Sequence, residues 1–140
     1  MGLRQWSTFA SVARDRAATR RPQEGRHLAS AEDNLAAERH TPAAGDAIHA
    51  GISSKDAIVT MLTGSTSKGK DHATAAKELK QALGKRPEAP TVEKALRELL
   101  SAKGEVEYGV ALVTAAQAEA LVRRARSLLE LAVQIVRLGR

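Results

Sequence analysis

The chain contains 140 residues, carries a formal net charge of +6 and has no cysteine, which excludes disulfides, thiolate metal sites and cysteine catalysis. Aromatic residues are only 2% of it, which disfavours RNA binders that stack bases on a sheet. The abundance of Ala, Leu, Glu, Lys and Arg predicts an all-α protein. No stretch has the roughly 20 apolar residues that a membrane span needs, so we expect a cytoplasmic protein without a membrane partner.

The N-terminal part of the chain is its basic part. Residues 1–27 hold six arginines and two acidic residues, a net charge of +4. The spacing of Trp6 and Phe9 predicts an amphipathic helix over residues 3–19. We therefore divide the chain into a basic N-terminal helix and arm, residues 1–27, and a helical bundle, residues 28–140. The arm suits an anionic partner such as nucleic acid; the alternative is a solvated helix with an arginine-rich loop.

The next two predicted helices are joined by almost no loop. A pattern like a capping box at Ser30 predicts a helix from about residue 24 or 31 to residue 40. The following helix is expected over residues 42–63, because Thr41 can cap its N-terminus, Pro42 suits its first position and Gly64 suits a left-handed stop. The short connection favours an antiparallel pair.

Three further helices are predicted in the second half of the chain. Their ranges are 71–83 with Asp71 as the N-cap, Thr91 to just before Gly104, and Thr114 to about Leu138, where Thr114 and Gln117 form a capping box. Residues 105–113 are compatible with an extended segment or with a continued helix. The wide apolar face of the last helix indicates burial by the bundle and by a second copy. We expect an up-and-down helical bundle of five or six helices.

Four short motifs occur along the chain, and their order and spacing are informative. They are DAIHAGISSKDAI at 46–58, KGKDHATAAKELKQAL at 68–83, LLSAKGEVEYG at 99–109 and TAAQAEALVRRARSLLE at 114–130. Together they resemble the bacterial HEPN-domain proteins, over roughly residues 28–138. The resemblance implies an up-and-down helical bundle that forms a homodimer and binds RNA or a nucleotide. Many members are ribonuclease toxins of toxin–antitoxin or defence systems, so a nucleotidyltransferase or another antitoxin is a candidate partner.

The ribonucleases of this family have an Arg followed, after four to six intervening residues, by a His. The Arg holds the scissile phosphate while the His moves a proton, without a metal ion. The visible match here is Arg21 with His27, which lies before the region of resemblance. No HxxxH or HExxH spacing is present, and we expect no metal ion or cofactor.

One polar constellation on the helix over residues 42–63 is a candidate site. Asp46, His49, Ser53 and Asp56 recur at spacings of three and four residues and therefore share one flank. An imidazole beside carboxylates can transfer a proton or hydrogen-bond a base or ribose. The alternative is a buried polar network between helices. His72, at the start of the next helix, can join either arrangement, and we take His49 and His72 as the candidate catalytic residues.

Two further groups complete the candidate ligand-binding set. That set consists of Asp46, Ser53, Asp56, Lys103, Glu107, Tyr108, Arg123 and Arg126. The group at 103–108 is either a polar site or a turn in which the tyrosine hydroxyl bonds to the backbone. The arginines of the last helix, Arg124 included, could form a phosphate patch with Lys77 or Lys80; the alternative is the solvated face of an amphipathic helix.

Three functions follow from these observations. We expect an HEPN-like helical domain that binds RNA or a nucleotide and belongs to a toxin–antitoxin or defence system. The first alternative is a metal-independent endoribonuclease toxin that uses His49 or His72 as the proton carrier. The second is a noncatalytic protein-interaction bundle, such as an antitoxin-like partner.

Overall fold

The described part of the chain is entirely helical outside its turns, which confirms the predicted all-α class. The computed structural model describes residues 23–65, 72–109 and 112–138. Its helices are α2 (Gln23–Ala36), α3 (His40–Thr63), α4 (His72–Leu83), α5 (Ala89–Tyr108) and α6 (Ala115–Leu138). The helix expected over residues 3–19 lies outside the described residues.

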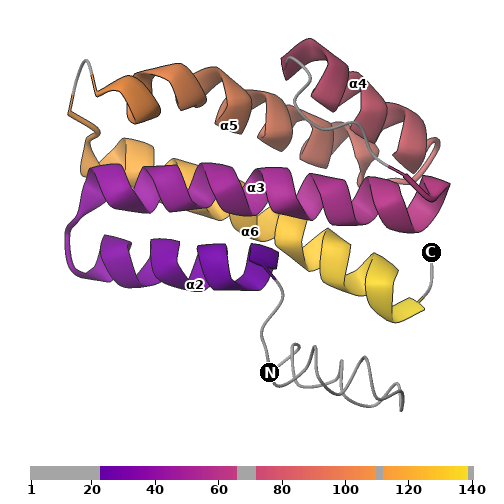
Figure 1. Cartoon of the computed structure of the whole chain (residues 1–140), viewed down its shortest axis with the longest axis horizontal. Coiled ribbons are helices and arrows are strands. Elements are labelled where there is room, and N and C mark those ends of the chain that lie inside the picture. The colour runs from indigo at the N-terminus through magenta and orange to yellow at the C-terminus, as the bar shows by residue number, and fades with distance from the viewer. Residues whose placement is uncertain (1–22, 66–71, 110–111, 139–140) are drawn as a thin grey trace.

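The long helix α3 is the central element of the bundle. It packs most extensively against α6 and α2, and also against α5 and α4. Figure 1 shows α2 and α5 on opposite sides of α3 and antiparallel to it, with α6 behind α3 and running in the same direction. The antiparallel pairing predicted for the two helices joined by a short loop is therefore confirmed. The short α4 lies at one end, against α3 and α5.

Small residues on α3 allow its neighbours to approach closely. Ala44, Ala47 and Ala50 are fully buried, and so is the backbone at Gly51. A Cβ atom at Gly51 would lie 2.5 Å from Cδ1 of Leu99 on α5 and 3.5 Å from Cδ1 of Leu128 on α6. The distance to Leu128 is an ordinary van der Waals contact, but the overlap with Leu99 means that any larger residue at position 51 requires the Leu99 side chain to shift. The small residues of α3 thus set how closely α5 and α6 pack against it.

Several helix ends agree with the predicted signals. Gly64 adopts a left-handed conformation (φ +90°), and its N–H donates to the Thr60 carbonyl at 2.8 Å. Thr114 and Gln117 form the predicted capping box: the Gln117 N–H donates to Thr114 Oγ1 at 3.1 Å, and the Thr114 N–H donates to Gln117 Oε1 at 2.9 Å. Such reciprocal bonds satisfy amide groups that the first helical turn leaves without an acceptor.

Other helix ends differ from the predictions. The helix α3 begins at His40, with Arg39 as an N-cap residue that makes no side-chain capping bond, so Thr41 is not the cap. Pro42 fits inside this first turn, where its missing N–H would have no intrahelical partner. The helix α5 begins at Ala89 and runs through Gly104 to Tyr108.

The segments around α2 and α5 also resolve two open alternatives. α2 spans Gln23–Ala36, which is close to the earlier of the two predicted starts but ends before residue 40. It also takes in residues 23–27 of the stretch assigned to the basic arm. Residues 105–108 continue α5 rather than forming an extended segment, and the helix stops at Gly109, whose φ is +64°. Val106 packs against the core, which favours the extra turn.

Among the helices that the structure describes, none combines the length and the apolar character that crossing a membrane requires.

Candidate functional site

The polar flank predicted on α3 divides into two groups, one that faces α2 and α5 and one that faces α4. His49 lies beside α5, where it meets Glu107, and Asp46 faces α2, where it meets Ser30. Asp56 instead turns to Lys55 and shares it with Glu78 of α4. The helical spacing placed these residues on one flank correctly, but neighbouring helices assign them to separate environments.

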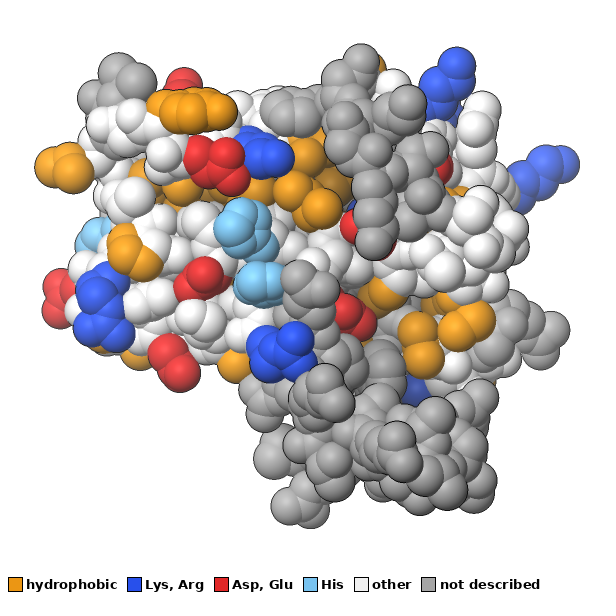
Figure 2. Space-filling view, in the orientation of Figure 1, with side chains coloured by type: hydrophobic (Ala, Val, Ile, Leu, Met, Phe, Trp, Pro, Cys, Tyr) orange, Lys and Arg blue, Asp and Glu red, His pale blue; other side chains and the backbone are white. Residues whose placement is uncertain are grey.

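The first group brings two imidazoles together. The ring of His27 on α2 and the ring of His49 on α3 are 5.4 Å apart between centroids and meet edge to face at 72°. Nε2 of His49 lies 3.5 Å from Oε1 of Glu107 on α5. Figure 2 shows two histidine side chains side by side in the middle of the viewed face, with acidic side chains nearby. We call His27, His49, Asp46 and Glu107 the histidine cluster.

Asp46 is held by hydrogen bonds that cross from α2 to α3. Its Oδ2 accepts a bond from Ser30 Oγ at 2.6 Å and one from Asn34 Nδ2 at 2.9 Å. Asn34 Oδ1 in turn accepts a bond from Arg39 Nε at 2.8 Å. These bonds fix the register between the two helices, and that register places the His27 ring beside the His49 ring.

The environment of His27 favours its neutral form. Burial is the largest cause that lowers its pKa from the ordinary value of 6.5, and the neighbouring His49 lowers it further. Asp46 acts in the opposite direction and Arg26 in the same direction, but the net pKa is lowered. The His27 imidazole is therefore largely uncharged at neutral pH, as a group that accepts a proton must be.

The histidine cluster is open to solvent. The side chain of His49 is 50% exposed and that of Glu107 is 33% exposed, so a polar ligand can reach both. Within the described residues, no group of three or more His, Cys, Asp or Glu side chains is placed to hold a metal ion. The chemistry that the geometry offers is hydrogen bonding and proton transfer.

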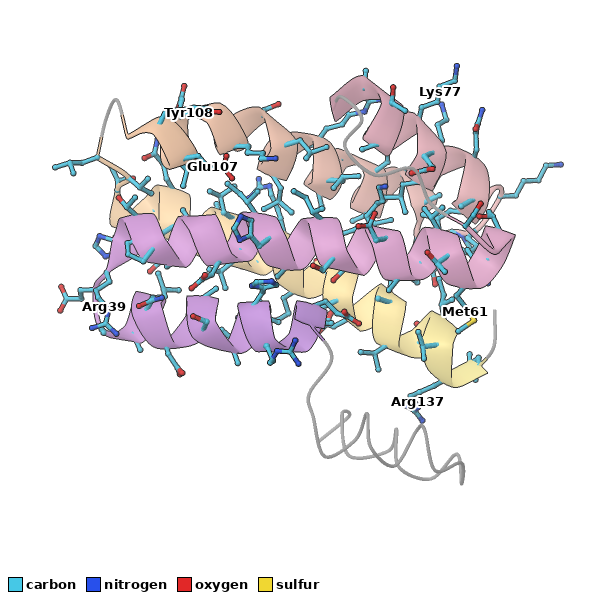
Figure 3. The ribbon with its side chains drawn as sticks, viewed as in Figure 1. Arg39, Met61, Lys77, Glu107, Tyr108 and Arg137 are labelled. Atoms are coloured by element: carbon cyan, nitrogen blue, oxygen red, sulfur yellow. The ribbon has the colours of Figure 1, made fainter. Side chains whose placement is uncertain are left out.

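The group predicted at residues 103–108 is divided by the helix that carries it. Figure 3 shows Glu107 on the side of α5 that faces α3, whereas Tyr108 points away from that side. Tyr108 is 80% exposed, and Lys103 is half-buried. Of these three predicted residues, the structure brings Glu107 to His49.

The predicted arginine patch is also divided, because its members lie on different sides of α6. Arg126 NH2 donates to Glu32 Oε2 of α2 at 2.8 Å. Arg124 makes a forked pair with Glu98 of α5, with distances of 2.6 Å and 3.0 Å; the pKa of Glu98 is lowered by this hydrogen bond. Arg123 is exposed, while Lys77 lies on the distant α4 (Figure 3).

The remaining predicted site residues stay as predictions. Ser53 is half-buried on α3. His72 is the first residue of α4, but its side chain lies outside the described part of the chain. The same holds for Arg21, so the predicted pair of Arg21 with His27 is not described, and the structure instead pairs His27 with His49.

The second polar group on α3 is centred on Lys55, which the sequence interpretation missed. Its side chain is 4% exposed, and its Nζ donates to Glu78 Oε1 at 2.7 Å and to Asp56 Oδ1 at 2.9 Å. Burial acts to lower the pKa of Lys55, but the hydrogen bonds to Glu78 and Asp56 outweigh it, and the pKa is raised. Lys55 is therefore charged and held between carboxylates. We call Lys55, Asp56 and Glu78 the lysine cluster.

Comparison with known proteins identifies no matching family model, no matching curated protein and no matching solved structure. The HEPN resemblance thus rests on the order and spacing of the four motifs in the chain. The importance of the histidine cluster rests on its geometry. The described residues establish the fold class, which is an all-α helical bundle.

Proposed function

We propose that this chain is an HEPN-like helical domain that binds RNA or a nucleotide at the histidine cluster. The single observation that carries the proposal is the meeting of His27, His49 and Glu107, from three different helices, at a half-exposed position. A structural polar group closes its hydrogen bonds inside the protein, as the lysine cluster does. In the histidine cluster, the side chains of His49 and Glu107 are 50% and 33% exposed, so a ligand can reach both.

The chemistry of the cluster suits a ribonucleotide. Imidazole N–H groups can donate to phosphate oxygens, while the carboxylate of Glu107 can accept from ribose hydroxyls or base amino groups. Arg26 lies close enough to influence the pKa of His27, and Arg39 is linked to Asp46 through Asn34. Both arginines are exposed and add positive charge that attracts a phosphate backbone.

The broader context of the proposal comes from the resemblance. We infer a homodimer within a toxin–antitoxin or defence system, with a nucleotidyltransferase or another antitoxin as the protein partner. The basic stretch at residues 1–27, with its net charge of +4, supports an anionic ligand because positive charge speeds and strengthens association with nucleic acid.

The test is binding of fluorescently labelled single-stranded RNA to the full chain at low salt, measured by anisotropy. We expect His49→Gln to weaken binding by about tenfold or more, which corresponds to roughly 1.4 kcal/mol. The matched control is His40→Gln, which changes a histidine of the same helix outside the cluster and should leave the affinity within about twofold. Absence of binding by the unaltered chain, even at low salt, would contradict the proposal and favour a protein-interaction bundle.

A second function, metal-independent endoribonuclease, is favoured by one specific observation. The imidazoles of His27 and His49 are in contact, and His49 has a carboxylate beside it, an arrangement suited to proton transfer. Cleavage of RNA that continues in EDTA and disappears in His49→Ala would support this function. Binding without cleavage would leave the chain as a binding domain.

A further inference from the structure

We propose that a pocket between α5 and α6 binds a small organic ammonium ion, with the apolar body of the ligand in the pocket and its charge at Glu105. The pocket has a volume of about 230 Å³, and most of its lining residues are apolar. We call it the α5–α6 pocket. It shares no residue with the histidine cluster or the lysine cluster, so this inference goes beyond the proposed function and does not depend on it.

The pocket exists because small side chains face each other across the two helices. Ala102 of α5 and Ala120 of α6 line it, and Val106 and Leu121 supply further apolar surface. The two helices run antiparallel (Figure 1), so residues 98–106 of α5 lie along residues 117–124 of α6. The volume is just below the range of about 300–1,000 Å³ that is typical of ligand pockets, which suits a ligand with a single ring.

An ion pair closes one end of the α5–α6 pocket. Arg124 Nε and Nη2 donate to the two carboxylate oxygens of Glu98 at 2.6 Å and 3.0 Å, and Arg124 Nη1 donates to the Ala120 carbonyl at 2.9 Å. All three nitrogens of this guanidinium are therefore engaged within the protein. An anionic ligand would have to displace Glu98 from a forked, charge-assisted pair, so the pocket is poorly suited to an anion.

The opposite end of the pocket carries the second carboxylate of the lining. The side chain of Glu105 is exposed and has no ion pair or hydrogen bond within the described part of the chain. Its position on α5 is about 10 Å along the helix from Glu98. Because Arg124 neutralises Glu98, Glu105 gives the lining a net negative charge, although the whole chain carries +6. This charge attracts a cation to the pocket.

Neighbouring groups determine the orientation of the ligand. Lys94 and Arg123 line an adjoining cavity on the far side of the pair between Glu98 and Arg124, and their positive charges repel an ammonium group from that end. Leu112 also lines the pocket and is 91% exposed, so a bound ligand would remove some of its apolar surface from water. The ammonium group therefore binds at Glu105, and the apolar body extends toward the ion pair.

The test uses three probes that share one apolar body and differ in charge. At neutral pH 4-phenylbutylamine is a cation, 4-phenylbutan-1-ol is neutral and 4-phenylbutanoate is an anion. Each probe is titrated into the isotopically labelled full chain, and the backbone and methyl signals are followed by NMR. A ligand this small is expected to bind with a Kd of about 1 mM. The amine should bind about two- to fivefold more tightly than the alcohol, the range for an exposed ion pair, and the anion should bind most weakly.

Variants with matched controls locate the binding site. Ala102→Leu and Ala120→Leu fill the pocket and should each weaken binding of the amine by about tenfold or more, because the phenyl ring loses its buried position. Ala36→Leu adds the same bulk at an exposed position of α2 and should leave binding unchanged. Glu105→Gln should abolish the preference for the amine over the alcohol. Glu119→Gln, which changes an exposed glutamate of α6 outside the pocket, should retain it.

Contacts measured in the unaltered chain keep the proposal testable even where a variant fails to fold, which a thermal unfolding curve reveals. Nuclear Overhauser effects should connect the phenyl ring of the amine with the methyl groups of Val106 and Leu121. Absence of signal changes with millimolar amine, absence of these ring contacts, or equal affinity for the three probes would overturn the proposal. Undiminished binding of the amine by folded Ala102→Leu and Ala120→Leu would overturn it as well.

Discussion

The histidine cluster and the lysine cluster are both centred on α3, yet they differ in how far their side chains are buried and how closely they are paired. Lys55 is 4% exposed and has both Glu78 and Asp56 within 2.9 Å of its Nζ. His49, six residues earlier, is 50% exposed and meets Glu107 only at 3.5 Å. A buried charge must be paired because its desolvation is costly, so the lysine cluster is explained by the fold. The histidine cluster does not pair a buried charge, so the same explanation does not account for it.

The strongest test of this contrast is the removal of the lysine charge. Lys55→Met keeps most of the side-chain length but leaves Glu78 and Asp56 without their cation. We expect the free energy of unfolding, measured with urea, to fall by about 1.5–3 kcal/mol, the range for hydrogen bonds to a charged group. RNA affinity of the folded protein should not change.

Lys80→Met is the matched control for the lysine prediction, since Lys80 is an exposed lysine on α4. This change should alter stability by no more than about 0.5 kcal/mol. If Lys55→Met instead kept full stability and abolished RNA binding, Lys55 would be a ligand contact, and the contrast between the clusters would fail.

Substitution of Ser54 should change the free energy of unfolding by a smaller amount and in the opposite direction. Its hydroxyl oxygen is fully buried and has no hydrogen-bond partner among the described residues. Ser54→Ala removes this unsatisfied group and improves helix propensity, so we expect a gain of about 1 kcal/mol in the urea-derived unfolding free energy. A loss of stability would show that the Ser54 hydroxyl has a partner in solution and belongs with the satisfied polar groups of α3.

The pH dependence of stability reports directly on His27. Because its pKa in the folded protein is below the ordinary value of 6.5, the unfolded chain binds more protons as the pH falls through 6.5 toward the folded value. The histidine therefore makes the protein less stable as the pH decreases over that window. Urea unfolding at pH 7.5 and pH 5.5 should show a smaller loss for His27→Gln than for the unaltered chain. An equal loss in both proteins would mean that His27 is as free to protonate in the bundle as in the unfolded chain.

The smallest effect is expected at the surface pair between α6 and α2. Arg126 and Glu32 are 41% and 44% exposed, and exposed pairs contribute about 0.2–1 kcal/mol. Arg126→Gln should lower stability within that range, and the difference should shrink in 0.5 M salt. If Arg126→Gln instead lowered RNA affinity by tenfold or more, Arg126 would be a phosphate contact, as the sequence predicted.

The helices were predictable where local chemistry determines them. The glycine stop at Gly64 and the capping box at Thr114 and Gln117 depend on residues close in sequence, and both are present. The extension of α5 through Gly104 depends instead on Val106 packing against the core. Local signals therefore missed it, since helix stability in proteins derives mainly from tertiary packing.

The candidate site was predictable only in part, for a similar reason. Helical spacing identified Asp46 and His49, which lie on one helix. The contact of His49 with His27 depends on the register between α2 and α3, and the contact with Glu107 depends on where α5 crosses α3. Neither contact can be predicted from the spacing of residues within one helix. Lys55 was missed because a lysine within an apolar helix looks like a surface residue until the acidic partner on α4 is placed beside it.

The most direct test of the account is to map RNA binding on the full chain by NMR, residue by residue. Methylated single-stranded RNA, which cannot be cleaved through its 2′-hydroxyl, is titrated into isotopically labelled protein, and the imidazole and backbone signals are followed. The histidine cluster predicts that the largest changes gather at His27, His49, Asp46 and Glu107, while the lysine cluster stays unaffected. Changes centred on Arg123 and the α5–α6 surface, or no changes at all, would contradict the assignment of the histidine cluster as the functional site.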